Sequence, residues 1–315
     1  FSDAQHREAT GGGAQAARPR FHGCPISILW RFPVEQKPLE GKIAIVTGAA
    51  SPRGLGRSMT EALVRAGARV SMMDINRQWL DESSNYMREI AGDDCVMTQV
   101  VDVSSSQEAE HSVQRTIEEL GGLHILVNNA GVAPRKMLMG GDTKNNFWEV
   151  PAEEWDRVVA VNSSGPFYMA RAVVPHMLAQ CWGRIIGVTT SMNTMYRAGG
   201  MPYGPSKAAH EALVAMASRE LEGTGVTVNV LVPGGRANTD LIPDAAAHDR
   251  SNMIQPDVMQ KPVVWLASEA SDGVNGQRFI GYYWDEDLPL DERLEKAAAP
   301  AAWPQLGAQA IRLNQ

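Results

Sequence analysis

A tyrosine and a lysine four residues apart, Tyr203 and Lys207, are the side chains of this sequence best suited to acid–base chemistry. The stretch 203–221 has helical periodicity, so both side chains project from one face of a helix. A free tyrosine has a pKa of about 10, too high for a base at neutral pH. The ammonium group of Lys207 favours the phenolate and lowers that pKa, which makes Tyr203 a candidate base for an alcohol proton. Without further context, such a pair is more often an ordinary surface pair of a helix.

A glycine-containing segment, 47–56 (TGAASPRGLG), joins a β-branched run at 42–47 to a helical stretch at 57–66. Glycine lets the backbone approach a ligand with no Cβ in the way, and the free amides at the start of a helix attract a diphosphate. No Gly-Lys-Ser/Thr triplet follows, so a P-loop for a triphosphate is excluded. The segment predicts a dinucleotide-binding turn, with an ordinary glycine-rich connection as the alternative.

An acidic residue, Asp74, ends the second predicted strand, 69–73. A carboxylate there can accept hydrogen bonds from the adenosine ribose hydroxyls and would repel a 2′-phosphate. Arg53, in the glycine-containing segment, is the opposing signal because it could pair with that phosphate. A carboxylate against a phosphate is a direct like-charge penalty, so the sequence favours NAD over NADP. The alternative for Asp74 is a solvated residue at a strand end.

The elements that position these residues alternate between strand and helix along the chain. Such connections require parallel strands covered by helices on both faces. The strands are nearly continuous Ile, Val and Leu, as doubly buried strands should be. We predict an α/β fold with a doubly wound parallel sheet in a single domain at 41–283, with an N-terminal arm (1–40) outside the core and a C-terminal tail (284–315). The expected strands are 42–47, 69–73, 96–101, 124–127, 184–188, 226–232 and 277–281, and the expected helices are 57–66, 76–91, 105–120, 152–180, 203–221 and 256–267.

The composition excludes several classes of function. The 315 residues carry a net charge of −7, which argues against a nucleic-acid or anionic-membrane surface. No apolar run reaches the roughly 18 residues of a membrane-spanning helix. The three cysteines and seven histidines show no metal-ligand spacing, so we expect no metal site. Widely separated, unpaired thiols are typical of a reducing compartment, so we expect a cytoplasmic protein.

Taken together, these motifs resemble the single-domain branch of the short-chain dehydrogenase/reductase family over roughly residues 40–283. The resemblance implies a Rossmann-type fold with about seven strands, a nicotinamide cofactor (NAD or NADP), and hydride transfer between a secondary alcohol and a ketone. The glycine turn departs from the family, because five residues separate Gly48 from Gly54 where the family has three. The matching pieces are Thr47-Gly48 with Gly54-Leu55-Gly56, Asp74, Asp102-Val103, Asn128-Asn129-Ala130-Gly131, Asn162, Tyr203-Gly204-Pro205-Ser206-Lys207 and Pro233-Gly234.

The resemblance also assigns roles to side chains. The family's catalytic serine lies thirteen positions before its tyrosine, where this chain has Thr190. Ser191 follows, and because serine is the family norm we favour Ser191 slightly and keep Thr190 as the alternative. Asn162 resembles the asparagine that anchors a water leading protons from Lys207 to solvent. The cofactor-binding residues that the resemblance and the glycine turn indicate are Gly48, Ser51, Arg53, Gly54, Leu55, Gly56, Asp74, Asp102, Val103, Asn129, Ala130, Gly131, Tyr203, Lys207, Pro233, Gly234 and Thr239.

Substrate selection falls to loops at the carboxyl ends of the strands, at 132–151, 193–202 and 238–255. These loops are rich in methionine, which adapts to irregular apolar shapes, so we expect a mid-sized, partly apolar hydroxy or keto compound. The alternative is that these residues pack under the loops or against another subunit. The resemblance implies a homotetramer or homodimer through the helices at 152–180 and 203–221. An isomerase or lyase on the same fold, and a dinucleotide sensor without turnover, stay open as other functions.

Overall fold

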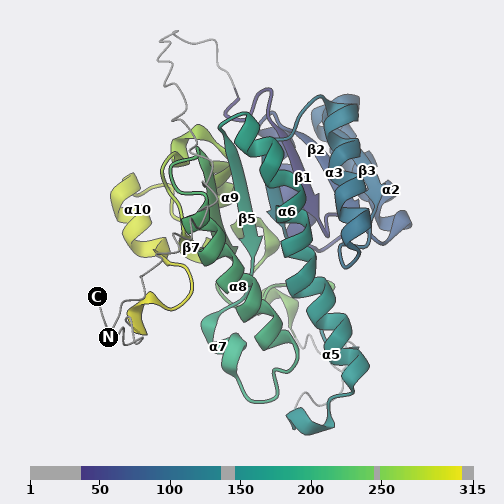
Figure 1. Ribbon diagram of the computed structural model, residues 1–315, viewed down its shortest axis with the longest axis vertical. Coiled ribbons are helices and arrows are strands. Elements are labelled where there is room, and N and C mark those ends of the chain that lie inside the picture. Colours follow the sequence, from purple (N-terminus) through teal and green to yellow (C-terminus); the bar gives the residue numbers. More distant parts are fainter. Residues whose placement is uncertain (1–36, 136–145, 245–248, 307–315) are drawn as a thin grey trace, which may run out of the picture.

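Eight strands form one sheet in the order β3-β2-β1-β4-β5-β6-β7-β8, in a computed structural model that describes residues 37–135, 146–244 and 249–306 (Figure 1). Strands β1 to β7 run parallel to their neighbours, and β8 pairs antiparallel with β7. Because the strand order reverses between β1 and β4, the predicted doubly wound fold is confirmed. The strands are β1 Ile43–Thr47, β2 Arg69–Asp74, β3 Val96–Val100, β4 Ile125–Asn128, β5 Gly183–Val188, β6 Val226–Val232, β7 Gln277–Ile280 and β8 Ala298–Pro300.

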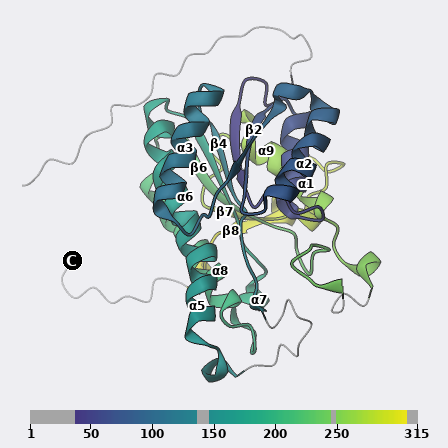
Figure 2. The same cartoon turned by 90° about the vertical axis from the view of Figure 1, so that its right-hand side faces the viewer.

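Helices cover both faces of the sheet, and each layer encloses its own apolar core. Figure 2 shows α1 and α2 on one side of the sheet and α3 and α6 on the other. The central strands β5 and β6 are buried along their whole length, as parallel strands between two helical layers must be. One core is closed by α1 Leu55–Arg65, α2 Arg77–Ala91 and α9 Gln260–Ala267, and the other by α3 Ser106–Leu120, α6 Gly165–Ala179 and α8 Tyr203–Glu220.

The long helix expected at 152–180 is interrupted by one π turn. It consists of α5 Ala152–Val159, a π turn at Ala160–Ser164, and α6. Pro166 has no N–H and cannot donate to the carbonyl of Asn162 four residues earlier. Gly165 donates instead to Ala160, five residues earlier, which is the π pattern. The glycine and proline therefore interrupt the helix with a π turn, and Asn162 lies within it.

The segment after residue 283, expected as a tail, adds a helix and an eighth strand to the fold. It contains α10 Leu290–Ala297 and β8. Trp284 is 7% exposed, and its ring centroid lies 5.0 Å from that of Trp265 and 6.0 Å from that of Phe279. β8 covers the edge of β7 that would otherwise be unpaired. The sheet has one strand more than expected, because three residues ending in a proline carry no strand pattern.

Most of the predicted N-terminal arm, 1–36, lies outside the described residues. At its end Leu39 is fully buried and its N–H donates to the Ala66 carbonyl at 2.9 Å, so the core begins a few residues before β1. Within the described ranges, no helix combines the length and apolarity needed to cross a membrane. Cys95 is a buried free thiol, but Cys181 is disulfide-bonded, so the expectation of unpaired thiols is wrong at Cys181.

Candidate active site

The predicted catalytic side chains gather at the carboxyl ends of β4 and β5, beside the point where the strand order reverses. Lys207 is 3% exposed, and its Nζ donates to the carbonyl of Val188, the last residue of β5, at 2.9 Å. Tyr203 begins α8 one turn earlier. Beyond this end of the sheet project α5 and the short helix α7 Met192–Tyr196 (Figure 1). Ligands of doubly wound folds bind at this position.

Burial dominates the acid–base properties of both side chains. Burial raises the pKa of Tyr203 to about 12, and a hydrogen bond with Thr190 opposes that rise. Burial also lowers the pKa of Lys207 to about 8. The prediction of a lowered pKa at Tyr203 is therefore wrong for this structure, because removal from water is the largest effect on the phenol. Tyr203 is a phenol at neutral pH and can act as a proton donor.

Of the two candidate hydroxyl residues, Thr190 is the one whose side chain lies near enough to the Tyr203 phenol to lower its pKa. Ser191 has a different task, because it is the N-cap of α7. Its Oγ accepts from the Thr194 N–H at 3.3 Å and lies 2.8 Å from Thr194 Oγ1. The structure thus brings Thr190 to Tyr203, against the slight preference for Ser191, because the unpredicted helix α7 engages the serine.

Two other predicted residues, Asn162 and Gly131, lie close to the Lys207 side chain. Asn162 is fully buried, and its Oδ1 accepts from the Val132 N–H at 2.8 Å. Its Nδ2 donates to the Val132 carbonyl and to Ser206 Oγ, at 3.0 Å each. A Cβ added at Gly131 would lie 3.2 Å from Lys207 Nζ and 3.4 Å from Asn162 Oδ1. The close approach of Gly131, Asn162 and Lys207 explains why a glycine follows β4 here.

The glycine turn presents backbone amides rather than side chains. Helix α1 begins at Leu55 with Gly54 as N-cap and has no side-chain cap, which leaves its first N–H groups available to an anion. A Cβ at Gly56 would lie only 2.2 Å from the Gly48 carbonyl oxygen and 2.5 Å from Asn129 Nδ2. Asn129 Nδ2 donates to the Gly48 carbonyl at 2.9 Å, so the segment after β4 is hydrogen-bonded to the glycine turn.

Asp74 and Thr47 hold the glycine turn and its neighbours from two sides. Asp74 Oδ2 accepts from the Ala50 N–H at 3.1 Å, and Oδ1 accepts from the Asn76 N–H at 3.0 Å. Thr47 Oγ1 accepts from the Ala130 N–H at 3.0 Å. The structure therefore places the Asp74 carboxylate at the end of β2 and in contact with the turn, the position from which it can meet a ribose.

An acidic residue that sequence reasoning missed, Asp240, binds two of the predicted cofactor residues. Its Oδ2 accepts from Ser51 Oγ at 2.6 Å and from the Arg53 N–H at 3.0 Å, and its Oδ1 accepts from Arg53 Nε at 2.6 Å. Arg53 also pairs with Asp244 at 3.3 Å. Burial opposes ionisation of Asp240, but the hydrogen bonds from Ser51 and Arg53 keep its pKa below the usual range. No spacing could have revealed this contact between residues 189 positions apart.

A second group that the sequence analysis missed lies behind Thr190. Arg278 on β7 donates to the Thr190 carbonyl and forms a buried ion pair with Glu211 on α8. A signal was present in the sequence, because Glu211 follows Lys207 by four residues and therefore shares its helical face. A carboxylate on a buried face requires a partner.

The remaining predicted cofactor residues follow β3 and β6. Asp102 is exposed, and its Oδ1 accepts from Ser104 N and Oγ at 2.9 and 2.7 Å, so it closes a local turn before α3. The N-cap of α3 is Ser105. Val103 is buried. The others lie beyond the end of β6 and are Pro233, Gly234 and Thr239.

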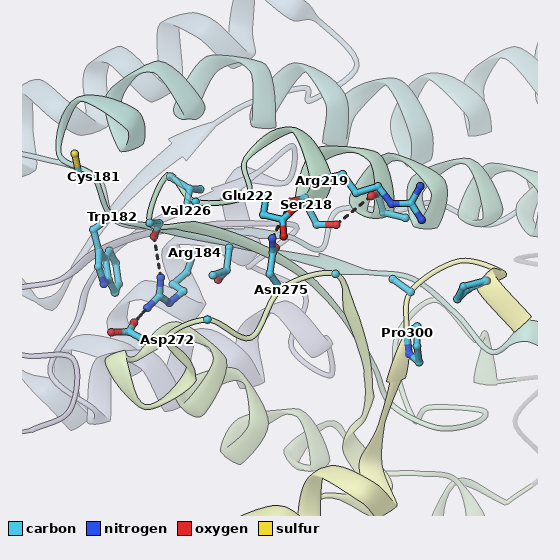
Figure 3. Close-up of a pocket in the computed structure, with 18 residues that line it drawn as sticks. Cys181, Trp182, Arg184, Ser218, Arg219, Glu222, Val226, Asp272, Asn275 and Pro300 are labelled. Carbon is cyan, nitrogen blue, oxygen red and sulfur yellow. Dashed lines mark hydrogen bonds and ion pairs between the residues drawn. The ribbon is translucent and has the colours of Figure 1, made fainter. Parts of the chain in front are cut away.

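The predicted substrate loops are described in part. Residues 136–145 and 245–248, with Met137 and Met139 among them, lie outside the described residues. Next to the first gap, Phe147 and Trp148 are 63% and 69% exposed. A cavity of about 660 Å³ lies at the opposite, amino end of β5 and β6, lined by Trp182 and Arg184 among others, and takes no part in this site (Figure 3).

The donor set fits a nicotinamide dinucleotide. Uncapped helix amides at a turn where a Cβ would clash suit a diphosphate, and the Asp74 carboxylate suits ribose hydroxyls. The Thr190 side chain lies close enough to Tyr203 to lower the pKa of its phenol, so two hydroxyl groups are available for acid–base chemistry on a substrate oxygen. In the part of the chain that the structure describes, no group of three or more His, Cys, Asp or Glu side chains is arranged to hold a metal ion.

Comparisons with known proteins agree with this geometry. The sequence profile described as short chain dehydrogenase matches residues 42–249. The 3-oxoacyl-[acyl-carrier-protein] reductase FabG of Thermotoga maritima is 29% identical over 247 residues, which cover 76% of this chain and 95% of that protein. The 2,5-dichloro-2,5-cyclohexadiene-1,4-diol dehydrogenase LinX of Sphingobium indicum is 30% identical over 258 residues, covering 80% and 96%. A solved short-chain dehydrogenase from Pseudomonas syringae has a TM-score of 0.66 and 26% identity, covering 78% of this chain and 97% of that one.

Proposed function

The chain belongs to the short-chain dehydrogenase family of oxidoreductases, and from that premise we propose that it uses NAD to interconvert a secondary alcohol and a ketone. The proximity of the Thr190 side chain to the Tyr203 phenol carries the proposal. It places a proton donor beside a second hydroxyl at the carboxyl end of the sheet. Lys207 lies one helical turn from Tyr203. Nucleotide binding alone does not require the Tyr203 hydroxyl.

The proposed chemistry assigns each side chain a step. In reduction, the Tyr203 hydroxyl gives its proton to the substrate carbonyl oxygen, and the Thr190 hydroxyl donates a hydrogen bond to the same oxygen. In oxidation, Tyr203 removes the alcohol proton. When bound, the nicotinamide supplies or accepts the hydride. Lys207 binds ribose hydroxyls and restores the proton of Tyr203, and Asn162 holds the backbone at Val132 beside it.

The protonation states favour reduction at neutral pH. Because burial raises the pKa of Tyr203 to about 12, this side chain holds a proton that it can donate. Oxidation needs Tyr203 as a phenolate, so it should be favoured at alkaline pH or by added positive charge at the site.

Two charge arrangements support NAD over NADP. The Asp74 carboxylate contacts the glycine turn, where it would repel a 2′-phosphate. Arg53, the side chain that could attract that phosphate, is paired with Asp240 and Asp244. Its charge is therefore neutralised within the chain, and a phosphate would have to compete with two carboxylates.

We further propose a homotetramer or homodimer through the outer faces of α6 and α8, as the family resemblance predicts. Phe167 on α6 and Met216 on α8 are 47% and 62% exposed. Exposed apolar side chains on neighbouring helices indicate an interaction surface. Sedimentation should give a mass of at least two chains, and Met216→Glu should lower it. A monomeric parent protein would contradict this part of the proposal.

The relatives' names guide the choice of substrates. One of them is named for a cyclic diol and another for a 3-oxoacyl group, so both ring alcohols and 3-oxo compounds belong in the test. The expectation of a cytoplasmic location depended on unpaired thiols, and the disulfide at Cys181 removes that argument, so we propose no compartment.

The deciding experiment follows the absorbance of the reduced nicotinamide. The purified protein is mixed with NAD and a panel of secondary alcohols, or with NADH and the matching ketones, and Tyr203→Phe serves as the control. We expect turnover that the control loses. Tight NADH binding with no absorbance change on any substrate would favour a dinucleotide sensor. Conversion of a substrate without net change in absorbance would favour an isomerase or lyase.

A further inference from the structure

A buried ion pair lies behind the hydroxyl assigned to catalysis. Glu211 on α8 is fully buried, and Arg278 on β7 is 7% exposed. The Arg278 guanidinium lies 2.5 Å from Glu211 Oε2. Removing two charges from water is costly, and an apolar pair of similar volume is often at least as stable. Stability alone therefore gives no reason for this pair, and its contacts indicate another role.

The pair holds the backbone that carries Thr190. β5 ends at Val188, so Thr189 and Thr190 lie beyond the hydrogen-bond ladder of the sheet. Arg278 donates to the Thr190 carbonyl and, at 3.3 Å, to Thr189 Oγ1. Thr189 Oγ1 donates in turn to Glu211 Oε2 at 2.7 Å. These contacts take the place of strand hydrogen bonds after β5 and hold the consecutive residues Thr189 and Thr190 in position.

The same pair is tied to the helix that carries the catalytic phenol. Tyr203, Lys207 and Glu211 follow one another at intervals of four on α8, so they share a helical face. The first residue carries the reacting hydroxyl, and the third anchors Arg278. The ion pair therefore links α8, which carries the Tyr203 hydroxyl, to β7, whose Arg278 holds the backbone of Thr190.

The C-terminal segment completes the enclosure of the pair. Ala299 of β8 lies opposite Arg278 in the antiparallel register. The Ala302 N–H donates to Glu211 Oε1 at 3.4 Å. Both residues lie beyond 42–249, the range that matches the family profile. The added strand thus covers the ion pair as well as the edge of the sheet.

We propose that Glu211 and Arg278 are positioning residues that hold the Thr190 hydroxyl against Tyr203. They touch neither substrate nor cofactor and act through the Thr190 backbone. The kinetic part of the test rests on the function proposed above, whereas the spectroscopic part does not.

The test replaces both charges at once, because removing one would leave the other buried without a partner. The test variant is Glu211→Leu/Arg278→Met. The matched control is Arg184→Met/Asp272→Asn, which removes another ion pair of a buried strand arginine, at the amino end of β5 (Figure 3). If the test variant does not fold, Arg278→Lys replaces it, because a single lysine nitrogen then stands in place of the two guanidinium nitrogens, Nη1 and Nη2, that contact Glu211 and the Thr190 carbonyl.

The spectroscopic part needs no substrate. The protein is labelled with carbon-13 at tyrosine Cζ, and the Tyr203 resonance is identified by its loss in Tyr203→Phe. Thr190→Ala removes the hydrogen bond and moves this resonance. We expect the test variant to move it in the same direction by at least about half as much, and the control to leave it in place. A folded test variant with an unmoved Tyr203 resonance would overturn the proposal.

The kinetic part separates positioning from general damage. A misplacement of about 1 Å can cost about 10²-fold in rate, so we expect kcat to fall by about that factor. Affinity for NADH should change less than about twofold, and the control should keep its kcat. In a Thr190→Ala background the test replacement should cost less than about threefold, because the group it positions is already gone. The full loss in that background would overturn the proposal. A parent protein without turnover would refute the proposed function and leave the spectroscopic result standing.

Discussion

Replacing the buried lysine of the active site should stabilise this protein while removing its activity. Lys207 is 3% exposed, and burial lowers its pKa from 10.5 to about 8. Lys207→Met keeps most of the side-chain volume and removes the charge. Below about pH 8 the parent carries a charged group in a dry site, and the variant does not.

The size of the effect follows from the pKa and from one hydrogen bond. A tenfold change in a protonation equilibrium corresponds to about 1.4 kcal/mol, so the buried charge costs the parent about 3 kcal/mol at neutral pH. The variant leaves the Val188 carbonyl, which Lys207 Nζ reaches at 2.9 Å, without that donor, at a cost of about 1–2 kcal/mol. The variant should therefore be more stable by about 1–2 kcal/mol near pH 7.

The sign of this difference should reverse with pH. The unfolded lysine titrates near 10.5 and the folded one near 8, so between these values the unfolded parent binds more protons, and its stability rises with pH. Above about pH 10.5 Lys207 is neutral in both the folded and the unfolded parent, so burying it no longer costs free energy for charge. The variant still lacks the hydrogen bond to the Val188 carbonyl and is therefore the less stable protein. Urea unfolding of both proteins from about pH 7 to 10.5 measures this. A stability difference that is independent of pH would refute the reasoning.

Four further substitutions and one pH profile test the site. Thr190→Ala should lower kcat by about 10²-fold and Ser191→Ala by less than about threefold; the reverse ranking in steady-state kinetics would restore Ser191 as the catalytic hydroxyl. Tyr203→Phe should abolish turnover and leave the NADH dissociation constant, measured by fluorescence, within about twofold; retained turnover contradicts its role. Alcohol oxidation should accelerate from about pH 7 to 10 while ketone reduction does not, because burial raises the pKa of Tyr203 to about 12; equal profiles would count against Tyr203 as the proton carrier. Asp74→Ala should narrow the NAD-to-NADP ratio of kcat/KM by at least about tenfold, and an unchanged ratio would refute the cofactor assignment.

Much of the fold could be predicted because the information is local. A β-branched run followed by glycine and a helical stretch predicts a strand, a turn and a helix at β1 and α1 wherever it occurs. Asp74 could be assigned because it follows the second strand, and parallel strands bring their carboxyl ends to one edge of the sheet. The contact between Asp74 and the Ala50 N–H agrees with that reasoning.

The parts that could not be predicted depend either on a choice between two adjacent residues of the same type or on contacts between residues far apart in the sequence. Ser191 and Thr190 are adjacent hydroxyl residues, and the choice between them depends on α7, a five-residue helix with too few residues to show a period. Asp240 binds Ser51 across 189 positions of sequence, and Arg278 binds Glu211 across 67. Contacts of this kind follow from topology and leave no local pattern.

The acidity of Tyr203 shows why residue types alone misjudge a site. A lysine one turn away suggests a lowered pKa, but that estimate assumes both groups are in water. Burial favours the neutral form of each group, which moves Tyr203 to about 12 and Lys207 to about 8. The phenol therefore holds its proton about 10⁴-fold more tightly than the ammonium does. Reduction needs only this state, whereas oxidation at neutral pH needs further positive charge near Tyr203, which NAD⁺ carries and NADH lacks. If the proposed function holds, the raised pKa of Tyr203 makes oxidation depend more than reduction on the charge of the bound cofactor.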